Sequence, residues 1–395
     1  MIAFLTLTFL TAAGVAVGTL QTLLTILFRR AGRFFHDGLP QQAFRSRPDG
    51  FTPRVSILKP VCGLEDDLEN NLLSFTTLRG INYEIIVSIA EREDPGLPIV
   101  ERIRMSNPAL PLRIVIGGDP RLENGNRKVA RLIAACPYAR GEILFISDAN
   151  VRVEPDDVAR AVAMFADRRV GCVSNLFTGA GARSLGARVE SLHLLGFVAP
   201  GNVLAAFAGV PCVVGKSMAI SRTALQAVGG FERFARVLAE DQAIGLAVRK
   251  AGFELRLSPA VVRNVVVRRS VRRAVDRQIR WNKIRYAFSR GTYSAEFLVN
   301  PLPFALFCAF LFGPPVWWMP LTVLGIRLAQ IATLSWAMSV PFGLRDALGV
   351  PLLDLLQFAA QFVPYVDDRV TWRGYSARLG PNTELIDVVP QAAAA

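Results

Sequence analysis

Residues 143–150 read Ile-Leu-Phe-Ile-Ser-Asp-Ala-Asn, a short apolar run that ends in polar side chains. Such a run is typical of a strand buried on both faces of a sheet. Similar runs precede it at residues 55–58, 84–90 and 112–116, and helix-like stretches separate them at 65–78, 97–105 and 127–135. This alternation of strands with helices predicts a doubly wound α/β sheet.

Polar residues after the predicted strands are the first candidate ligands, because doubly wound sheets bind ligands beyond the carboxyl ends of their strands. Asp148 and Asn150 offer oxygens that suit a divalent cation on a diphosphate, although both residue types also favour turns and caps. Asp94 either accepts from a nucleotide base or belongs to an acidic surface turn. Lys59 follows the first strand, and Lys128 either binds phosphate or is a solvated surface lysine. Neither a dinucleotide fingerprint nor a P-loop follows the first strand.

The pair Glu240-Asp241 opens an amphipathic run at residues 243–251. A carboxylate at a helix start interacts favourably with the helix dipole, which is sufficient reason for its presence there. A carboxylate near an acceptor hydroxyl can also serve as a general base. The sequence leaves both interpretations of Asp241 open.

A basic and aromatic segment follows, with Arg277 and Arg280 on one predicted helical face and Trp281 beside them. It continues a basic run that begins at Arg268. Two inward arginines could hold a diphosphate through bidentate contacts. Part of the segment also fits a basic amphipathic helix on anionic lipid headgroups.

Three apolar regions suggest a membrane protein. Residues 2–28 carry no charge and are followed by Arg29-Arg30. A basic cluster after the apolar run favours a membrane helix over a cleaved signal peptide, and it predicts that the chain leaves this helix into the cytoplasm. Residues 297–342 are long enough for two spans, with a break near Pro320 and one charge, Arg327. Residues 344–363 carry a polar stripe that either lies in the membrane interface or faces the protein. The stripe consists of Asp354, Gln357 and Gln361.

Composition excludes several classes. The 395 residues are 52% hydrophobic and carry a formal net charge of +13. The five cysteines are scattered and the histidines number two, so neither a zinc site, a disulfide framework nor a Ser-His hydrolase is indicated. No recognition motif accompanies the basic charge, so we expect no nucleic-acid partner.

Taken in order, these residues resemble the ceramide glucosyltransferase family, glycosyltransferase family 21, over about residues 53–290. The matching motifs are Asp94 in Glu-Arg-Glu-Asp-Pro, Asp148 in Ser-Asp-Ala-Asn, Asp241 in Ala-Glu-Asp-Gln, and Arg277-x-x-Arg280-Trp281. The resemblance implies a GT-A fold, a UDP-sugar donor (usually UDP-glucose), a divalent cation such as Mg²⁺ or Mn²⁺, and inversion at the anomeric carbon.

The resemblance also implies roles for single residues. Asp94 would contact the uridine, Asp148 the metal and diphosphate, and Asp241 would be the general base. Arg280 and Trp281 would close over donor or acceptor. Cys212 matches a family cysteine near the donor, although a cysteine is also a common small buried residue.

Two departures from the family pattern concern the metal and the acceptor. Ala149 leaves one carboxylate in the second motif, and Ala199 stands where vertebrate members carry a histidine before a proline. Alternative acceptors are a hopanoid, diacylglycerol or a sterol. A processive polysaccharide synthase shares these motifs but normally has more spans, and a non-catalytic membrane scaffold is a further alternative.

We therefore expect a lipid glucosyltransferase, acting on ceramide, in the inner membrane of a bacterium with its catalytic domain in the cytoplasm. Its partners would be the UDP-sugar, a membrane lipid acceptor and anionic lipid headgroups. The expected organisation is a membrane helix at 1–30, a GT-A domain at 50–270, an interfacial basic helix at 271–292, two membrane helices at 296–342, an amphipathic or membrane helix at 343–366, and a cytoplasmic tail at 367–395.

Overall fold

The computed structural model describes residues 1–36, 52–118, 125–372 and 375–390, so the ends of the expected ranges at 50–51 and 391–395 lie outside the described residues. Two compact units form. The sheet unit is Arg30–Thr178 with Ala205–Val266, and the helical unit is Met1–Arg29 with Gly179–Leu204 and Val267–Ala395. Residues 179–204, which we expected inside the 50–270 domain, thus belong to the helical unit.

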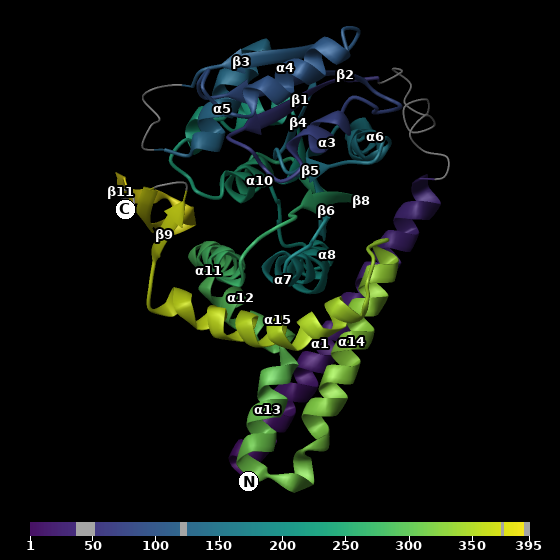
Figure 1. The fold of residues 1–395 in the computed structure, drawn as a ribbon, viewed down its shortest axis with the longest axis vertical. Helices are drawn as coiled ribbons and strands as arrows, with labels where there is room; N and C mark the ends of the chain where they lie inside the picture. Colours follow the sequence, from purple (N-terminus) through teal and green to yellow (C-terminus); the bar gives the residue numbers. More distant parts are fainter. Residues whose placement is uncertain (37–51, 119–124, 373–374, 391–395) are drawn as a thin grey trace. The chain divides into compact units, whose positions relative to one another are not determined.

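The sheet unit is built on one eight-stranded sheet with the order β3-β2-β1-β4-β7-β6-β8-β5 (Figure 1). Its first four strands run parallel, as the alternating pattern predicted. β7 pairs antiparallel with both β4 and β6, and β5 pairs antiparallel with β8. The strands are β1 Arg54–Val61, β2 Asn82–Ile89, β3 Leu112–Ile116, β4 Ile143–Ser147, β5 Val151–Arg152, β6 Val170–Ala180, β7 Ser217–Ser221 and β8 Glu254–Val265.

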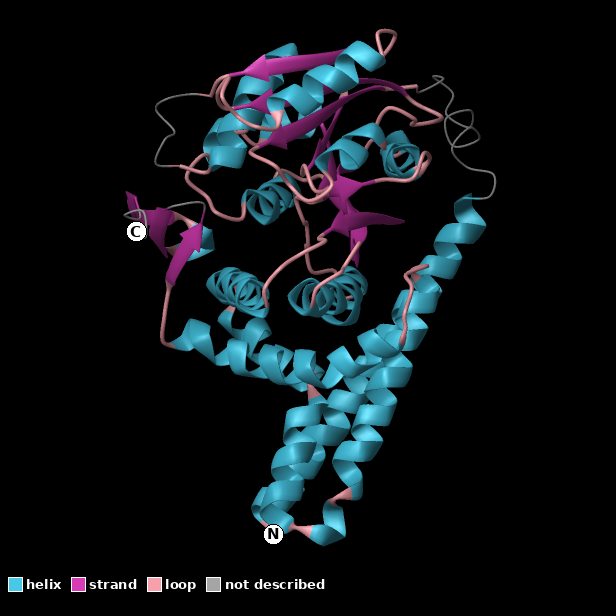
Figure 2. Cartoon of the chain, viewed as in Figure 1, coloured by secondary structure: helices cyan, strands magenta, loops and turns pink. Residues whose placement is uncertain are grey.

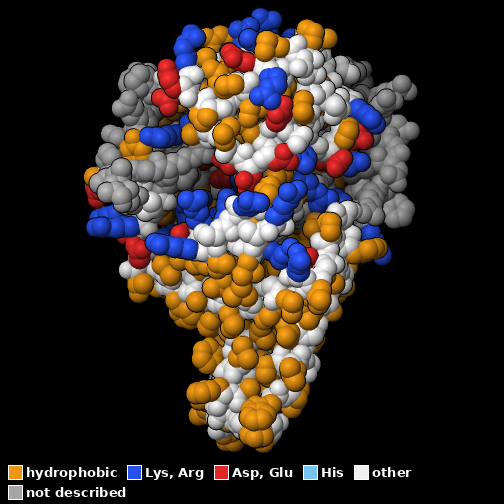
Figure 3. All heavy atoms as spheres, viewed as in Figure 1, with side chains coloured by type: hydrophobic (Ala, Val, Ile, Leu, Met, Phe, Trp, Pro, Cys, Tyr) orange, Lys and Arg blue, Asp and Glu red, His pale blue; other side chains and the backbone are white. Residues whose placement is uncertain are grey.

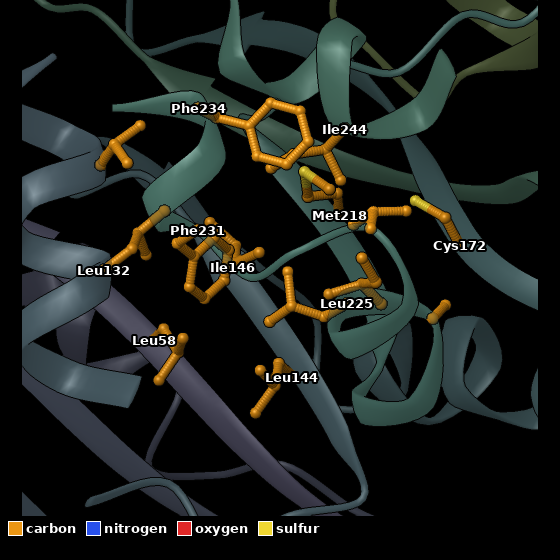
Figure 4. Close-up of a cluster of buried hydrophobic side chains, with 14 of the residues drawn as sticks. Leu58, Leu132, Leu144, Ile146, Cys172, Met218, Leu225, Phe231, Phe234 and Ile244 are labelled. Atoms are coloured by element: carbon orange, nitrogen blue, oxygen red, sulfur yellow. The ribbon is translucent and has the colours of Figure 1, made fainter. Parts of the chain in front are cut away.

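Among its described residues six α-helices accompany this sheet, and a shared apolar core fixes two of them, α5 and α10, against it. Leu58 of β1, Ile146 of β4, Leu132 of α5 and Ile244 of α10 belong to one buried cluster (Figure 4). Burying each such side chain stabilises the fold by ~1.5–3 kcal/mol. The helices are α3 Leu68–Leu73, α4 Leu97–Ser106, α5 Arg127–Ala135, α6 Asp157–Ala163, α9 Arg222–Ala227 and α10 Glu240–Lys250.

The helical unit contains a bundle of α1, α13 and α14, crossed at one end by α15 (Figures 1 and 2). Figure 3 shows hydrophobic side chains covering the visible face of this bundle. Trp318 and Trp336 are exposed and about 27 Å apart along α14, close to the hydrocarbon thickness of a bilayer. The helices are α1 Ile2–His36, α7 Leu185–His193, α8 Ala199–Phe207, α11 Val271–Phe288, α12 Arg290–Ala295, α13 Pro301–Phe312, α14 Trp318–Ala337 and α15 Leu344–Phe362.

Length and composition identify which described helices could cross a membrane. They are Ile2–Gly32, Leu185–Phe207 and Leu344–Tyr365, with a fourth if the bent pair Arg290–Val299 and Pro301–Phe312 forms one span. The second of these was not expected, and α14, which was, is not among them. The break that we expected near Pro320 lies instead at Gly313, where the backbone φ of 73° suits glycine. Pro320 does not interrupt α14, because it lies in the first turn of the helix, where proline is tolerated.

The polar stripe of α15 faces the protein. Asp354, Gln357 and Gln361 are all buried, and the Asp354 carboxylate forms a bidentate pair with Arg327 of α14, with both N–O distances 3.1 Å. The only charge expected inside the 297–342 region therefore has its partner on the next helix. Inward placement of the stripe leaves the opposite face of α15 apolar and exposed.

The C-terminal segment, which we expect as a cytoplasmic tail at 367–395, contains a small sheet among its described residues. Three antiparallel strands form a small sheet in the order β11-β10-β9. Lys283 of α11 bonds the Asp367 carboxylate at 2.6 Å and so links this segment to α11. The strands are β9 Arg369–Trp372, β10 Tyr375–Leu379 and β11 Leu385–Pro390.

Candidate active site

The site in the sheet unit begins where α5 and α10 start close together. Asn126 caps α5, since its side-chain oxygen accepts from the backbone N–H groups of Lys128 and Val129. Its amide nitrogen donates to the Glu240 carboxylate at 2.8 Å and to two carbonyls just before α10. One buried asparagine therefore fixes both helix starts, which brings Lys128 next to the Glu240-Asp241 pair.

Asp148, directly after β4, lies between two lysines. Lys128 Nζ is 2.9 Å from one carboxylate oxygen and Lys216 Nζ is 3.0 Å from the other. Burial raises the pKa of Asp148, but the two ammonium groups outweigh it and hold the pKa well below its usual range. Asp148 is thus ionised throughout the physiological range.

Lys128 connects this aspartate with the second acidic motif. Its ammonium is also 2.9 Å from Glu240 and donates to the Gly215 carbonyl at 3.0 Å. Burial lowers the pKa of Lys128, while Asp148, Glu240 and Asp241 raise it by more, so the net shift is upward. Lys128 is therefore a permanent cation of the cluster rather than a solvated surface lysine.

Asp241 has a different electrostatic environment from Asp148. Its carboxylate accepts from the Gly215 and Gln242 backbone N–H groups. Burial and the neighbouring charge of Glu240 raise its pKa to about 6, against the opposing effect of Lys128. Two carboxylates near the same lysine thus differ strongly in proton affinity, which is the pattern of an acid–base site.

Gly215 makes this close approach possible. A Cβ at this position would lie 2.6 Å from Lys128 Nζ and 3.0 Å from an Asp241 oxygen. Gln242 holds the same loop, since its side chain accepts from Val213 N–H and donates to the Pro211 carbonyl, each at 2.8 Å. Cys212 therefore lies in a loop attached directly to the start of α10.

Lys59 and Asp94 support the loops around the cluster. The Lys59 side chain is fully buried and donates to the Asp148 carbonyl at 2.7 Å. Burial lowers its pKa to about 7, despite the raising effect of Asp148. The Asp94 carboxylate accepts from Gly63 N–H at 2.9 and 3.0 Å and from Gly96 N–H at 2.8 Å. Asp94 thus joins the loops that follow β1 and β2.

The basic-aromatic motif belongs to the helical unit. Arg277 is buried, its Nε is 3.3 Å from the Glu190 carboxylate, and its guanidinium stacks 3.9 Å from the centre of the Trp281 ring. Arg280 and Trp281 are half-buried on α11. The two motif arginines thus differ, because Arg277 turns inward to a carboxylate of α7.

A divalent cation would find few carboxylates here. Among the described residues, no group of three or more His, Cys, Asp or Glu side chains is placed to hold a metal ion. Lys216 nevertheless bridges Asp148 and Asn150, with its Nζ 3.0 Å from an oxygen of each. Because the Lys216 ammonium already contacts both oxygens, Asp148 and Asn150 are close enough to share one metal ion. Such an ion would take its remaining ligands from a donor diphosphate and water.

Sequence reasoning missed Lys216 and Gly215, two residues in the middle of this cluster. They lie in the loop before β7, an antiparallel strand that the alternating pattern did not predict. The sequence did carry a signal for Lys216, since only five lysines occur in the chain. Lys216 also directly follows the segment 212–215, which contains Cys212.

Comparison with known proteins provides a family. Ceramide glucosyltransferase 1 of Caenorhabditis elegans is 27% identical over 266 residues, which are 67% of this chain and 56% of that protein. Ceramide glucosyltransferase 3 of the same organism is 25% identical over 269 residues, 67% of this chain and 57% of its own length. The chain thus spans little more than half of these relatives. A solved mannosyltransferase from Pyrobaculum calidifontis, in complex with GDP-Man and Mn²⁺, is 20% identical with a TM-score of 0.49, covering 91% of this chain and 99% of its own.

The family model described as glycosyl transferase family 21 matches residues 7–385, which is nearly the whole chain. The doubly wound sheet, the carboxylate after β4 and the apolar helices agree with the GT-A architecture and membrane segments expected from the motifs. The chain belongs to glycosyl transferase family 21.

Proposed function

We propose that this glycosyltransferase moves glucose from UDP-glucose to the primary hydroxyl of ceramide, with inversion at the anomeric carbon. The observation that carries the proposal is the largely enclosed cluster in which Lys128 contacts both Asp148 and the buried Glu240, with Asp241 alongside. A fixed anion, a fixed cation and a carboxylate of raised pKa are the groups that such a transfer needs. The family relatives named as ceramide glucosyltransferases support this choice of donor and acceptor.

Asp241 acts as the general base. With a pKa of about 6 it is mostly ionised at neutral pH, yet it accepts a proton more readily than an ordinary aspartate. It removes the hydroxyl proton as the lipid oxygen attacks the anomeric carbon. The new C–O bond forms while the bond to the diphosphate oxygen breaks, and the electron pair leaves with UDP, so the product is a β-glycoside.

Lys128 and Lys216 bind the donor phosphates. Lys128 also contacts Asp148 and Glu240, and Lys216 also contacts Asp148, so the two lysines alone do not neutralise a bound diphosphate. This balance supports dependence on a divalent cation, Mg²⁺ or Mn²⁺, held by Asp148 and Asn150. When bound, the cation would neutralise charge on the departing diphosphate.

The remaining motif residues have proposed donor roles. Lys59 holds Asp148 in place by its bond to the carbonyl, and Cys212 lies in the loop near the sugar nucleotide. Asp94 contacts the uridine, since a carboxylate has about four acceptor positions and its backbone partners do not fill them all. Arg280 and Trp281 remain the candidates for closing over donor or acceptor, and Arg277 remains a candidate donor-binding residue.

The acceptor enters from the bilayer. The apolar helices support a membrane location, and the arginines after the first apolar run favour a sheet unit in the cytoplasm, at the inner membrane of a bacterium. The product would then form at the cytoplasmic face.

Expression in a host that lacks glycolipids, followed by lipid mass spectrometry, tests the proposal. A hexosylceramide that appears with the wild-type chain and disappears with Asp241→Asn is the expected result. A hexosaminyl-hopanoid or a glycosylated diacylglycerol would overturn the acceptor. If no lipid, with metal present, causes UDP release, the chain is a scaffold and the proposal fails.

A further inference from the structure

A basic cavity that is widely open to solvent lies wholly within the helical unit, where α7 and α11 begin beside each other. Its volume is about 470 Å³. The residues that line it are Arg183, Ser184, Arg268, Arg269, Ser270 and Arg273. The proposed transfer reaction uses none of them.

Two helix starts are held close together at this cavity. Ser184 caps α7 and also donates to the Arg269 carbonyl and accepts from the Arg269 N–H, at 2.8 and 2.9 Å. Ser270 caps α11 by accepting from the Arg273 N–H. A Cβ at Gly186 would overlap the Arg269 carbonyl oxygen, so glycine permits this approach. The starts of both helices, where the first backbone N–H groups have no acceptor within their own helix, therefore lie at the same cavity.

The charge at this place is of one sign. Neither α7 nor α11 has an acidic residue in its first turn, where acidic residues usually offset the positive end of the helix dipole. Arg183, Arg268 and Arg273 are exposed around it. The nearby carboxylate, Glu190, is already bound by both Arg269 and Arg277. Two positive helix ends and four arginines therefore line one cavity, and phosphate is the anion that this geometry binds best.

The surroundings of the cavity indicate that the phosphate belongs to a lipid. Arg188, in the first turns of α7, forms an ion pair with Asp346 in the first turn of α15. Leu344 and Leu348 lie on either side of Asp346 and are exposed. The start of α7 therefore lies beside the start of α15, which carries apolar side chains that a bilayer would cover. A phospholipid can place its phosphate against the arginines and its acyl chains against the apolar side chains. A soluble phosphate can contact only the arginines.

We propose that the cavity between the starts of α7 and α11 binds the phosphate of an anionic phospholipid headgroup. The lipid would anchor the helical unit at the membrane surface. The proposal concerns lipid binding and does not depend on the transfer reaction.

Binding of short-chain phosphatidic acid to the full-length protein in neutral detergent tests this site, with phosphatidylcholine and inorganic phosphate as parallel probes. The test variant is Arg268→Gln/Arg273→Gln, which removes two exposed cavity arginines. The matched control is Arg272→Gln/Arg290→Gln, which removes the same charge from exposed positions outside the cavity. Because neither pair is part of the buried core, both variants should fold.

We expect the wild type to bind phosphatidic acid and not phosphatidylcholine. Losing two charge-assisted contacts should weaken binding by ~10- to 100-fold in the cavity variant, with the control within about twofold of wild type. Equal weakening in both variants would mean attraction to general surface charge and would overturn the site. Inorganic phosphate that binds as tightly as phosphatidic acid would overturn the lipid assignment, and no binding of either would overturn the proposal.

Discussion

Replacing Asp241 by Asn should abolish transfer without weakening the fold. Burial and Glu240 raise the pKa of Asp241 from 3.8 to about 6, so the native state holds this proton more tightly than the unfolded chain does. The carboxylate therefore destabilises the native state increasingly as pH rises from ~4 to ~6, and its effect is constant above that. At ~1.36 kcal/mol for each pKa unit, ionised Asp241 costs the fold ~3 kcal/mol at pH 7.

The neutral amide removes that cost but loses one acceptor. The amide nitrogen cannot accept a hydrogen bond from the backbone N–H of Gly215 or Gln242. Losing one of these bonds lowers the free energy of unfolding by ~1–3 kcal/mol. The free energy of unfolding at pH 7 should thus be unchanged or up to ~2 kcal/mol higher. Transfer should fall by ~10²–10⁴-fold, the usual contribution of a general base. Thermal unfolding at pH 7 and at pH 4 would show whether the difference between variant and wild type disappears in acid.

Activity against pH provides the second measurement. Wild-type turnover should decline below about pH 6, roughly tenfold for each unit, as Asp241 is protonated. Glu240→Gln is the matched variant, because Glu240 raises the pKa of Asp241 and its loss should move the acid limb to lower pH. An Asp241→Asn protein that keeps wild-type turnover, or that unfolds more than ~1 kcal/mol more easily, would refute the reasoning about this half-buried carboxylate.

Three further outcomes follow from the packing. Asp354→Ala leaves Arg327 buried without its bidentate partner, so the free energy of unfolding in detergent should fall by ~3–5 kcal/mol. The double variant Asp354→Ala/Arg327→Met should recover most of this stability, which a thermal melt would measure. Gly215→Ala should reduce turnover ~10- to 100-fold while circular dichroism stays unchanged, whereas Gly201→Ala, where a Cβ meets nothing within 4 Å, should act like wild type. Lys216→Ala should raise the KM for the sugar nucleotide by about tenfold, and an unchanged KM would argue against a phosphate contact.

The parallel half of the sheet could be predicted from sequence because its signal is local. Each strand is a short apolar run, and the helices between them follow at regular spacing. The antiparallel strands β6, β7 and β8 lack that regularity, so their order was not foreseen. The same holds for β9–β11, whose pairing depends on contacts that no local pattern records.

The candidate site divides along the same line. Asp94, Asp148 and Lys128 follow predicted parallel strands, and the strand-end rule was enough to select them. Lys216 comes from the antiparallel half and approaches Asp148 through tertiary folding alone. The pKa contrast between Asp148 and Asp241 also lay beyond the sequence, because it depends on which carboxylate faces two lysines and which faces another carboxylate.

The membrane region gives the clearest case of information divided between two segments. From sequence, Arg327 was the one charge in an apolar region, where it could snorkel or need a partner, and the stripe with Asp354 could lie in the interface or face the protein. Each requirement was visible, but 27 positions separate the two residues and neither pattern names the other. A buried arginine between apolar helices costs several kcal/mol unless it pairs with a carboxylate. The arginine in α14 is therefore sufficient reason for the aspartate in the stripe of α15. Pairing unmatched buried charges across neighbouring apolar helices is therefore a physical rule that could have placed α15 against α14 in advance.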